Sequence, residues 1–224
     1  MGSDDLFRKL KAKASKKKSR EIEKKEPYSK FLIVCEDTVS GYHYLLECIK
    51  HFRLSSANFH LVGLGQDPLN IVKEAERILK EESRSHKPDF DFAFCVFDRD
   101  EHSNYYNAIN KIASLNKNQG SKCLSINSNP CFELWLLLHF VYTTKSFDKT
   151  QNKTAAKNVE AELKQHFPNY TKSNRKIFQE TFENIETALG NAEKLERYCN
   201  TSFVDVPFTN FHTLMKFIMS IKKS

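Results

Sequence analysis

The chain has 224 residues, 40% of them hydrophobic, which is enough for the core of one compact domain with an extension or cap. No apolar run approaches the roughly 18 residues of a membrane span, and the first 25 residues are charged rather than apolar, so we expect neither a membrane segment nor a signal peptide. The net charge of +7 is unevenly placed, because residues 1–25 hold ten Lys or Arg and only four Asp or Glu.

Residues 1–26 form a basic arm, which Pro27 separates from the rest of the chain. A block so rich in lysine is either a disordered arm or a weak helix that becomes ordered on binding. It would contact the phosphates of a nucleic acid without reading its sequence; the alternative is a leader that only increases solubility. The candidate contacts are Lys16, Lys17, Lys18 and Arg20.

Six cysteines are scattered along the chain without a CxxC spacing. Three of them, Cys35, Cys95 and Cys123, fall in strand-like segments. We therefore expect all six to be reduced and mostly buried, in a cytoplasmic protein, and the spacing does not support a zinc site.

Between residues 27 and 143, short apolar segments alternate with segments of helical periodicity. The predicted strands cover residues 30–35, 58–65, 91–97 and 122–127, and the predicted helices cover residues 42–52, 68–82, 103–118 and 131–141. This order predicts an α/β core, with a parallel sheet covered by helices on both faces. Residues 144–224 show no further strand signal, and helices predicted over 152–166, 173–201 and 210–222 would form a helical cap or side layer.

Acidic residues follow two of the predicted strands. Glu36 ends the first strand, and Asp98 and Asp100 follow the third. If the first strand lies between the second and the third, the first and third strands are neighbours at the point where strand order reverses. Ligands of open parallel sheets bind at such a point, outside the carboxyl ends of the strands, so Glu36 would meet the two aspartates there.

The spacing of Asp98 and Asp100 places both side chains on one side of the chain. Two such carboxylates repel each other unless a cation compensates them, and Mg²⁺ (or Mn²⁺) is the cation that suits carboxylates beside substrate phosphates. Glu36 would then be a base acting on a water molecule or a further ligand. The plainer alternative is that these acids cap helices or lie solvated in turns.

Three more residues are candidates for the same crevice. His102 is either a general acid or phosphate contact, or a helix cap. Glu133, which follows the fourth strand, is either a metal ligand or an acid that interacts with the dipole of its own helix. Arg99 is either a contact to the substrate's phosphate or the partner of a salt bridge.

Together these segments resemble the RloB-like proteins of the TOPRIM superfamily. The resemblance rests on FLIVCED (31–37), VFDRDEH (96–102) and NPCFELWLLLHF (129–140), on the basic leader, and on the closing segment Thr209-Asn210-Phe211-His212. It covers roughly residues 20–220. The loop that begins Cys35-Glu36-Asp37-Thr38 departs from the family's usual CEGE-x-TE pattern, because its second and third acids are missing.

The resemblance implies a TOPRIM fold and Mg²⁺-dependent phosphodiester chemistry. It assigns the superfamily's glutamate role to Glu36 and its metal-binding roles to Asp98 and Asp100, while His102 and Glu133 belong to RloB-type motifs. It also implies a nuclease of a prokaryotic anti-phage or abortive-infection system, with nucleic acid and an ATPase or another defence protein as partners. A homo-oligomer is equally compatible with the sequence.

Two other functions stay open. One is a non-catalytic nucleic-acid-binding or assembly subunit that keeps the TOPRIM shape, which the altered loop after Glu36 favours. The other is a metal-dependent phosphatase with Asp98 as nucleophile and Asp100 as acid. In haloacid-dehalogenase-type phosphatases, however, the two aspartates lie on the first strand, whereas here they follow the third.

Overall fold

The computed structural model describes residues 30–54, 59–84, 90–99, 103–118, 122–204 and 206–221. The predicted arm with Lys16, Lys17, Lys18 and Arg20 lies outside these residues, as do Asp100 and His102. Among the helices that are described, none is long and apolar enough to cross a membrane.

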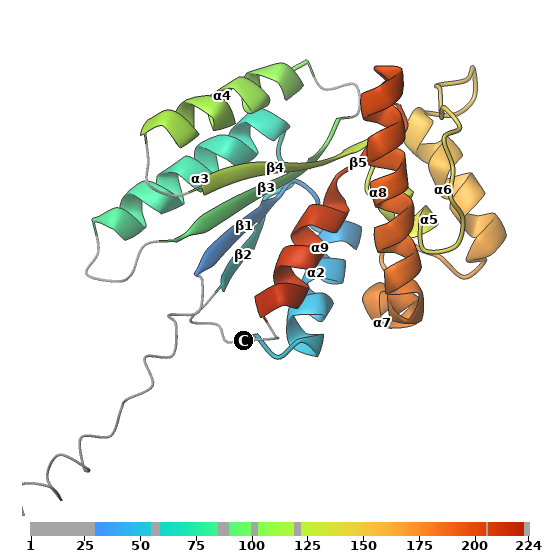
Figure 1. Ribbon diagram of the computed structural model, residues 1–224, viewed down its shortest axis with the longest axis horizontal. Coiled ribbons are helices and arrows are strands. Elements are labelled where there is room, and N and C mark those ends of the chain that lie inside the picture. Colours follow the sequence, from blue (N-terminus) through green and yellow to red (C-terminus); the bar gives the residue numbers. More distant parts are fainter. Residues whose placement is uncertain are drawn as a thin grey trace, which may run out of the picture.

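A five-stranded sheet forms the centre of the fold (Figure 1). Its order is β2 (Phe59–Gly63), β1 (Phe31–Cys35), β3 (Phe92–Asp98), β4 (Lys122–Asn129) and β5 (Phe208–Thr209). The first four strands are parallel, and β5 is antiparallel to β4. The predicted α/β class is therefore confirmed, and β1 lies between β2 and β3 as the predicted crevice requires.

Helices cover both faces of the sheet, which explains why the strands read as continuous apolar runs. Two helices, α3 (Pro68–Ser83) and α4 (Tyr105–Asn118), cover one face, while α2 (Ser40–His51) and α9 (Phe211–Ile221) cover the other (Figure 1). All five residues of β1 are at most 1% exposed. Alternate side chains of β1 point to opposite faces of the sheet and so enter two different hydrophobic cores. Leu32 packs in the smaller core, beneath α3 and α4, and Ile33 packs in the larger core on the other face.

The carboxyl-terminal region is mostly helical, as predicted, but two details differ. The described helices are α5 (Glu133–Leu137), α6 (Ala155–His166), α7 (Ile177–Thr181), the 3₁₀ helix η1 (Phe182–Asn184), α8 (Ile185–Ser202) and α9. The helix predicted over residues 131–141 is only five residues long, and β5 was missed. A strand of two residues is too short to show an alternating pattern, and α5 is buried on all sides, so neither has a readable period.

All six cysteines are buried and free, as predicted. Two of them lie on neighbouring strands, where the Sγ atoms of Cys95 and Cys123 are 3.8 Å apart.

His139 is a buried neutral group in the larger core. It is 1% exposed, its Nδ1 lies 3.0 Å from the carbonyl oxygen of Trp135, and its Nε2 lies 3.3 Å from the hydroxyl of Tyr44. Nδ1–H therefore donates to Trp135, and Nε2 accepts from Tyr44. Burial lowers the pKa of His139 to about 4, because the charged imidazolium would lose its water.

Acid should therefore destabilise the fold through His139. Between pH 6.5 and about 4 the unfolded chain binds a proton at this residue that the folded chain does not, so stability falls as pH falls through that window. The expected loss is about 3 kcal/mol. Urea unfolding of the wild type and of His139→Gln at pH 7 and pH 4.5 measures it. An equal loss in both proteins would rule out His139 as the cause.

Candidate functional site

Glu36 and Asp98 lie together at the carboxyl edge of the sheet, although 62 residues separate them. The backbone N–H of Glu36 donates to the carbonyl of Val96 at 2.8 Å, which extends the pairing of β1 with β3 by one residue. The Glu36 carboxylate then accepts the backbone N–H of Asp98 at 3.0 Å. The strand order thus places the first acid directly beside the second, at the switch point between β1 and β3.

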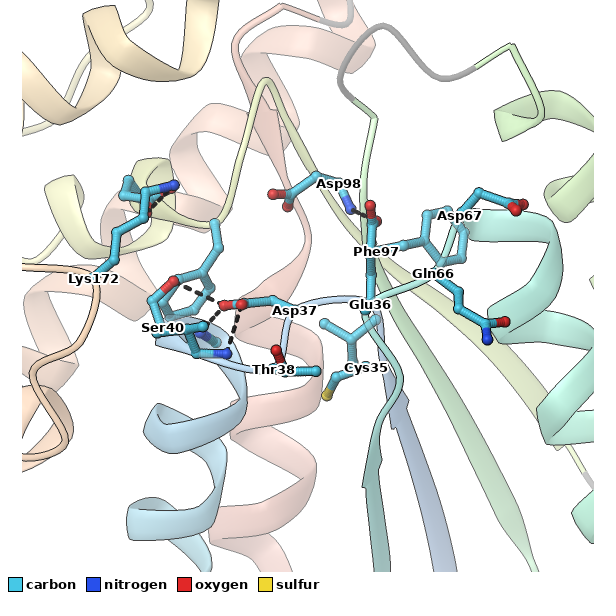
Figure 2. A pocket seen from close by; sticks show the side chains of 16 residues that line it. Cys35, Glu36, Asp37, Thr38, Ser40, Gln66, Asp67, Phe97, Asp98 and Lys172 are labelled. Atoms are coloured by element: carbon cyan, nitrogen blue, oxygen red, sulfur yellow. Dashed lines mark hydrogen bonds and ion pairs between the residues drawn. The ribbon is translucent and has the colours of Figure 1, made fainter.

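These two acids line a cavity of about 450 Å³. Its walls come from the loops after β1 and β2, from the end of β3, from the start of α5, and from the segment after α6 (Figure 2). Gly65, in the loop after β2, adopts a φ of +63°, and its N–H donates to the carbonyl of Glu36. Glycine is the residue that adopts this left-handed conformation without strain, so it suits the turn that closes this wall.

The carboxyl group of Asp98 lies in surroundings that disfavour its charge. Its pKa is raised well above the usual range, first by burial and then by the negative charges of Glu133 and Glu36. A backbone hydrogen bond from Phe132 acts in the opposite direction. The neighbouring negative charges therefore disfavour the ionised form of Asp98. A cation bound beside the carboxylate would stabilise that form.

Two other aspartates in the cavity wall bind backbone N–H groups at the start of a helix. Asp37 accepts hydrogen bonds from the N–H of Val39 at 2.7 Å, from the N–H of Gly41 at 2.5 Å and from the hydroxyl of Ser40 at 2.8 Å (Figure 2). Asp67 caps α3 by accepting the N–H of Leu69 at 3.0 Å. Both side chains therefore hold backbone N–H groups at the start of a helix, and neither carboxylate was among the predicted site residues.

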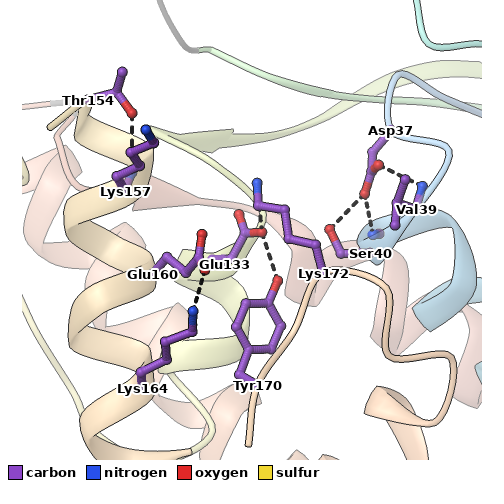
Figure 3. Close-up of polar contacts among 11 residues, drawn as sticks. Asp37, Val39, Ser40, Glu133, Thr154, Lys157, Glu160, Lys164, Tyr170 and Lys172 are labelled. Atoms are coloured by element: carbon purple, nitrogen blue, oxygen red, sulfur yellow. Dashed lines mark hydrogen bonds and ion pairs between the residues drawn. The ribbon is translucent and has the colours of Figure 1, made fainter. Parts of the chain in front are cut away.

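Glu133 forms a buried cluster that the sequence did not reveal. It is 2% exposed, and its carboxylate accepts the hydroxyl of Tyr170 at 2.8 Å and lies 3.1 Å from the ammonium of Lys172 (Figure 3). Burial alone would lower the pKa of Lys172, but the charge of Glu133 and its hydrogen bond act together in the opposite direction, and the pKa is raised. Lys172 lies in the segment after α6, where no periodic pattern signals its contact with α5.

Arg99 emerges on the opposite face of the sheet from Asp98, because adjacent residues of a strand point to opposite sides. Its guanidinium lies 5.4 Å from the ring centre of Tyr105 and 5.6 Å from that of Tyr106, and it donates to the hydroxyl of Tyr106 at 2.8 Å. Of the predicted site residues that are described, Glu36, Asp98 and Glu133 therefore share one cavity, and Arg99 lies in another.

A family model described as RloB-like protein matches residues 31–218. The chain belongs to the RloB-like protein family. The match runs from β1 into α9, so it covers both the sheet and the carboxyl-terminal helices. No curated protein matches the chain.

In the described part of this RloB-like protein, Glu36 and Asp98 could hold a magnesium ion that has few protein ligands. Among the described residues, no three His, Cys, Asp or Glu side chains lie close enough to hold one metal ion. Mg²⁺, however, usually keeps several waters and needs only one or two carboxylates in addition to substrate phosphates. Glu36 and Asp98 supply two, and the mutual repulsion around Asp98 favours a cation. For Glu133 to bind the same ion, Lys172 would have to move.

Proposed function

We propose that this RloB-like protein is a Mg²⁺-dependent nuclease that hydrolyses phosphodiester bonds of DNA or RNA. The observation that carries the proposal is the contact between Glu36 and Asp98 at the switch point of a parallel sheet, inside a cavity where Asp98 is destabilised by neighbouring negative charge. An acidic cavity repels phosphate unless a metal lies between them, so a phosphate-handling role requires the ion.

Each residue has a distinct role in this proposal. Glu36 and Asp98 would hold Mg²⁺ or Mn²⁺, together with Asp100. When bound, the ion would polarise the phosphoryl group and stabilise the leaving oxygen. Lys172 is held at the cavity by Glu133, and its half-exposed ammonium is placed to attract a substrate phosphate. The roles of His102 as a proton donor and of Glu133 as a further ligand stay predictions.

We place this activity in the cytoplasm, as part of an anti-phage or abortive-infection system with an ATPase or another defence protein as partner. The family supports the setting, and the six free, buried cysteines support a reducing compartment. The basic arm, with Lys16, Lys17, Lys18 and Arg20, would add contacts to the phosphates of the substrate.

Three observations favour a second function, that of a non-catalytic nucleic-acid-binding or assembly subunit. Within the described ranges no cluster of three metal ligands is formed, Asp37 binds backbone N–H groups at the start of α2, and Glu133 is paired with a lysine. Such a protein would keep the basic arm and the fold but would bind no divalent metal at Glu36 and Asp98. Metal binding therefore separates the two functions.

The test is a cleavage assay with plasmid DNA and tRNA, with and without Mg²⁺ or Mn²⁺, in the presence of candidate partners. We expect cleavage that needs the metal and that falls about 100-fold or more in Glu36→Gln, because the ion supplies several kcal/mol of charge stabilisation. Glu74→Gln is the matched control, since Glu74 pairs with Arg77 on the outer surface of α3. No cleavage with any metal, substrate or partner would overturn the nuclease proposal.

A further inference from the structure

A second cavity, of about 310 Å³, lies on the other face of the sheet from Asp98. It is formed where the start of α4 faces the end of α8 above β4 and β5 (Figure 1). Its lining includes Arg99, Tyr105, Tyr106, Asn127, Val204 and Phe208. The volume falls in the range of pockets that bind small ligands or single groups of larger ones.

One wall of this cavity is a cationic and aromatic platform. The Arg99 guanidinium lies over the rings of Tyr105 and Tyr106, and its hydrogen bond to the Tyr106 hydroxyl fixes the relative position of the two groups. Tyr106 is 62% exposed, which is unusual for so large a ring. A planar guanidinium held beside exposed aromatic rings is a surface on which another flat ring can stack.

The opposite side of the cavity is apolar. Val204 is 40% exposed and Phe208 is partly buried, and they come from the end of α8 and from β5. Next to them Phe203, at the end of α8, is 96% exposed. An aromatic platform on one side and apolar groups on the other leave a slot that suits a flat ring.

The floor of the slot carries amide groups. Asn127 is 7% exposed, its Nδ2 donates to the Tyr105 hydroxyl at 2.9 Å, and its Oδ1 has no hydrogen-bond partner among the described residues. Asn200 also lines the cavity. The Asn127 oxygen is buried behind the cavity surface, so the amide that a bound ring can reach directly is that of Asn200, which is exposed. Stacking on both faces and amide contacts at the edge are the features by which proteins bind an unstacked nucleobase.

We propose that this cavity holds one unstacked base of a single-stranded segment of the nucleic acid whose backbone enters the acidic cavity. The inference rests on the proposed function and extends it, because it assigns the substrate to unpaired strands. The two cavities lie on opposite faces of the sheet at the carboxyl end of β3, where Asp98 lines the first and the next residue, Arg99, lines the second. A duplex cannot place a base in the slot without unstacking it.

The test measures binding by fluorescence anisotropy, without metal so that nothing is cut. The probes are labelled single strands of about twelve nucleotides, within the span that such binding surfaces cover, and blunt duplexes of the same sequence. Single strands should bind more tightly than duplexes. Tyr106→Ala should weaken single-strand binding about tenfold, because one base stacked on an aromatic ring contributes about that factor, and should leave duplex binding unchanged.

Two variants serve as controls. Tyr106→Phe keeps the ring and should bind nearly as the wild type does. Tyr142→Ala removes a comparably exposed tyrosine that lines neither cavity, and should have no effect. A 2-aminopurine base in the strand should lose fluorescence on binding to the wild type and keep it with Tyr106→Ala, because stacking quenches it.

Several results would overturn the inference. They are unchanged single-strand binding in Tyr106→Ala, equal affinity for strands and duplexes, and no binding of any nucleic acid. Competition by nucleoside monophosphates as strong as that by strands would show a site for free nucleotides instead. If the protein cleaves nucleic acid but Tyr106→Ala binds single strands as the wild type does, the base-binding cavity is contradicted and the nuclease proposal is not. If single-strand binding depends on Tyr106 but no nucleic acid is cleaved, the nuclease proposal is contradicted and the base-binding cavity is not.

Discussion

Replacing Asp98 with asparagine should abolish cleavage and at the same time stabilise the folded protein at neutral pH. The raised pKa of Asp98 means that the folded chain holds this carboxyl's proton more tightly than the unfolded chain does. The cost of ionising it in the folded state therefore grows as pH rises above the ordinary aspartate range. Asparagine has no charge to bury, so we expect a gain of about 1–2 kcal/mol in the free energy of unfolding, as at other active-site positions.

Urea unfolding at pH 7 measures this gain. The same assay with Mg²⁺ present measures how much the bound ion stabilises each protein. At a concentration 100 times the dissociation constant, the ion should stabilise the wild type by about 2.7 kcal/mol and should not stabilise Asp98→Asn. The control is Asp91→Asn at the other end of β3, where Asp91 accepts the N–H of Lys30 at 2.8 Å and the change should destabilise. A destabilised Asp98→Asn protein would mean that Asp98 has a structural role.

Altering the Glu133 cluster should move the pH dependence of activity in two opposite directions. Glu133 contributes negative charge that raises the pKa of Asp98, and Lys172 offsets that charge. Glu133→Gln should therefore lower the pKa of Asp98 and move the acid limb of the pH–rate profile to lower pH. Lys172→Met leaves Glu133 uncompensated, so it should raise the pKa of Asp98 and move the acid limb to higher pH.

The same pair of variants should differ in stability. Lys172→Met leaves a buried carboxylate with the Tyr170 hydroxyl as its hydrogen-bond donor, which is costly. Because the Lys172 side chain is 53% exposed, solvent screening reduces the expected loss to about 1–2 kcal/mol. Lys164→Met, which breaks a pair with Glu160 on the outside of α6, should cost only about 0.3–0.5 kcal/mol.

These profiles also test whether Glu133 is a metal ligand. A Glu133→Gln enzyme that loses activity equally at every pH would support direct binding of the ion. A shifted profile with the maximum rate retained would instead assign Glu133 a positioning role, in which it holds Lys172 and tunes Asp98. If neither variant shifts the pH–rate profile, Glu133 and Lys172 do not influence the reaction.

Much of the fold could be predicted from the sequence because its signals are local. The apolar strands and the helices between them have readable periods, and the order of a parallel α/β chain leaves few arrangements. That order was enough to place Glu36 beside Asp98 across 62 residues. The acids were found because they directly follow strands, and the carboxyl ends of parallel strands meet at one edge of the sheet.

The features that were missed depend on distant contacts. Lys172 and Tyr170 belong to an irregular segment, and only the packing of α6 against α5 brings them to Glu133. The hydrogen bonds of Asp37 to the start of α2 had a local signal, since Ser40 and Gly41 open the helix three and four residues later, but no role was predicted for Asp37. β5 pairs with β4 through Thr209, and a two-residue strand has no pattern to read.

The most direct test of the metal site is isothermal titration of Mn²⁺ and Mg²⁺ into the full chain, alone and saturated with a single strand that resists cleavage. We predict saturable binding to the wild type that weakens about tenfold or more in Glu36→Gln and is lost when Asp98→Asn is added, because each change removes a charged ligand. Equal affinity in the wild type and the double variant, or no binding even with the strand present, would contradict a metal site built on Glu36 and Asp98.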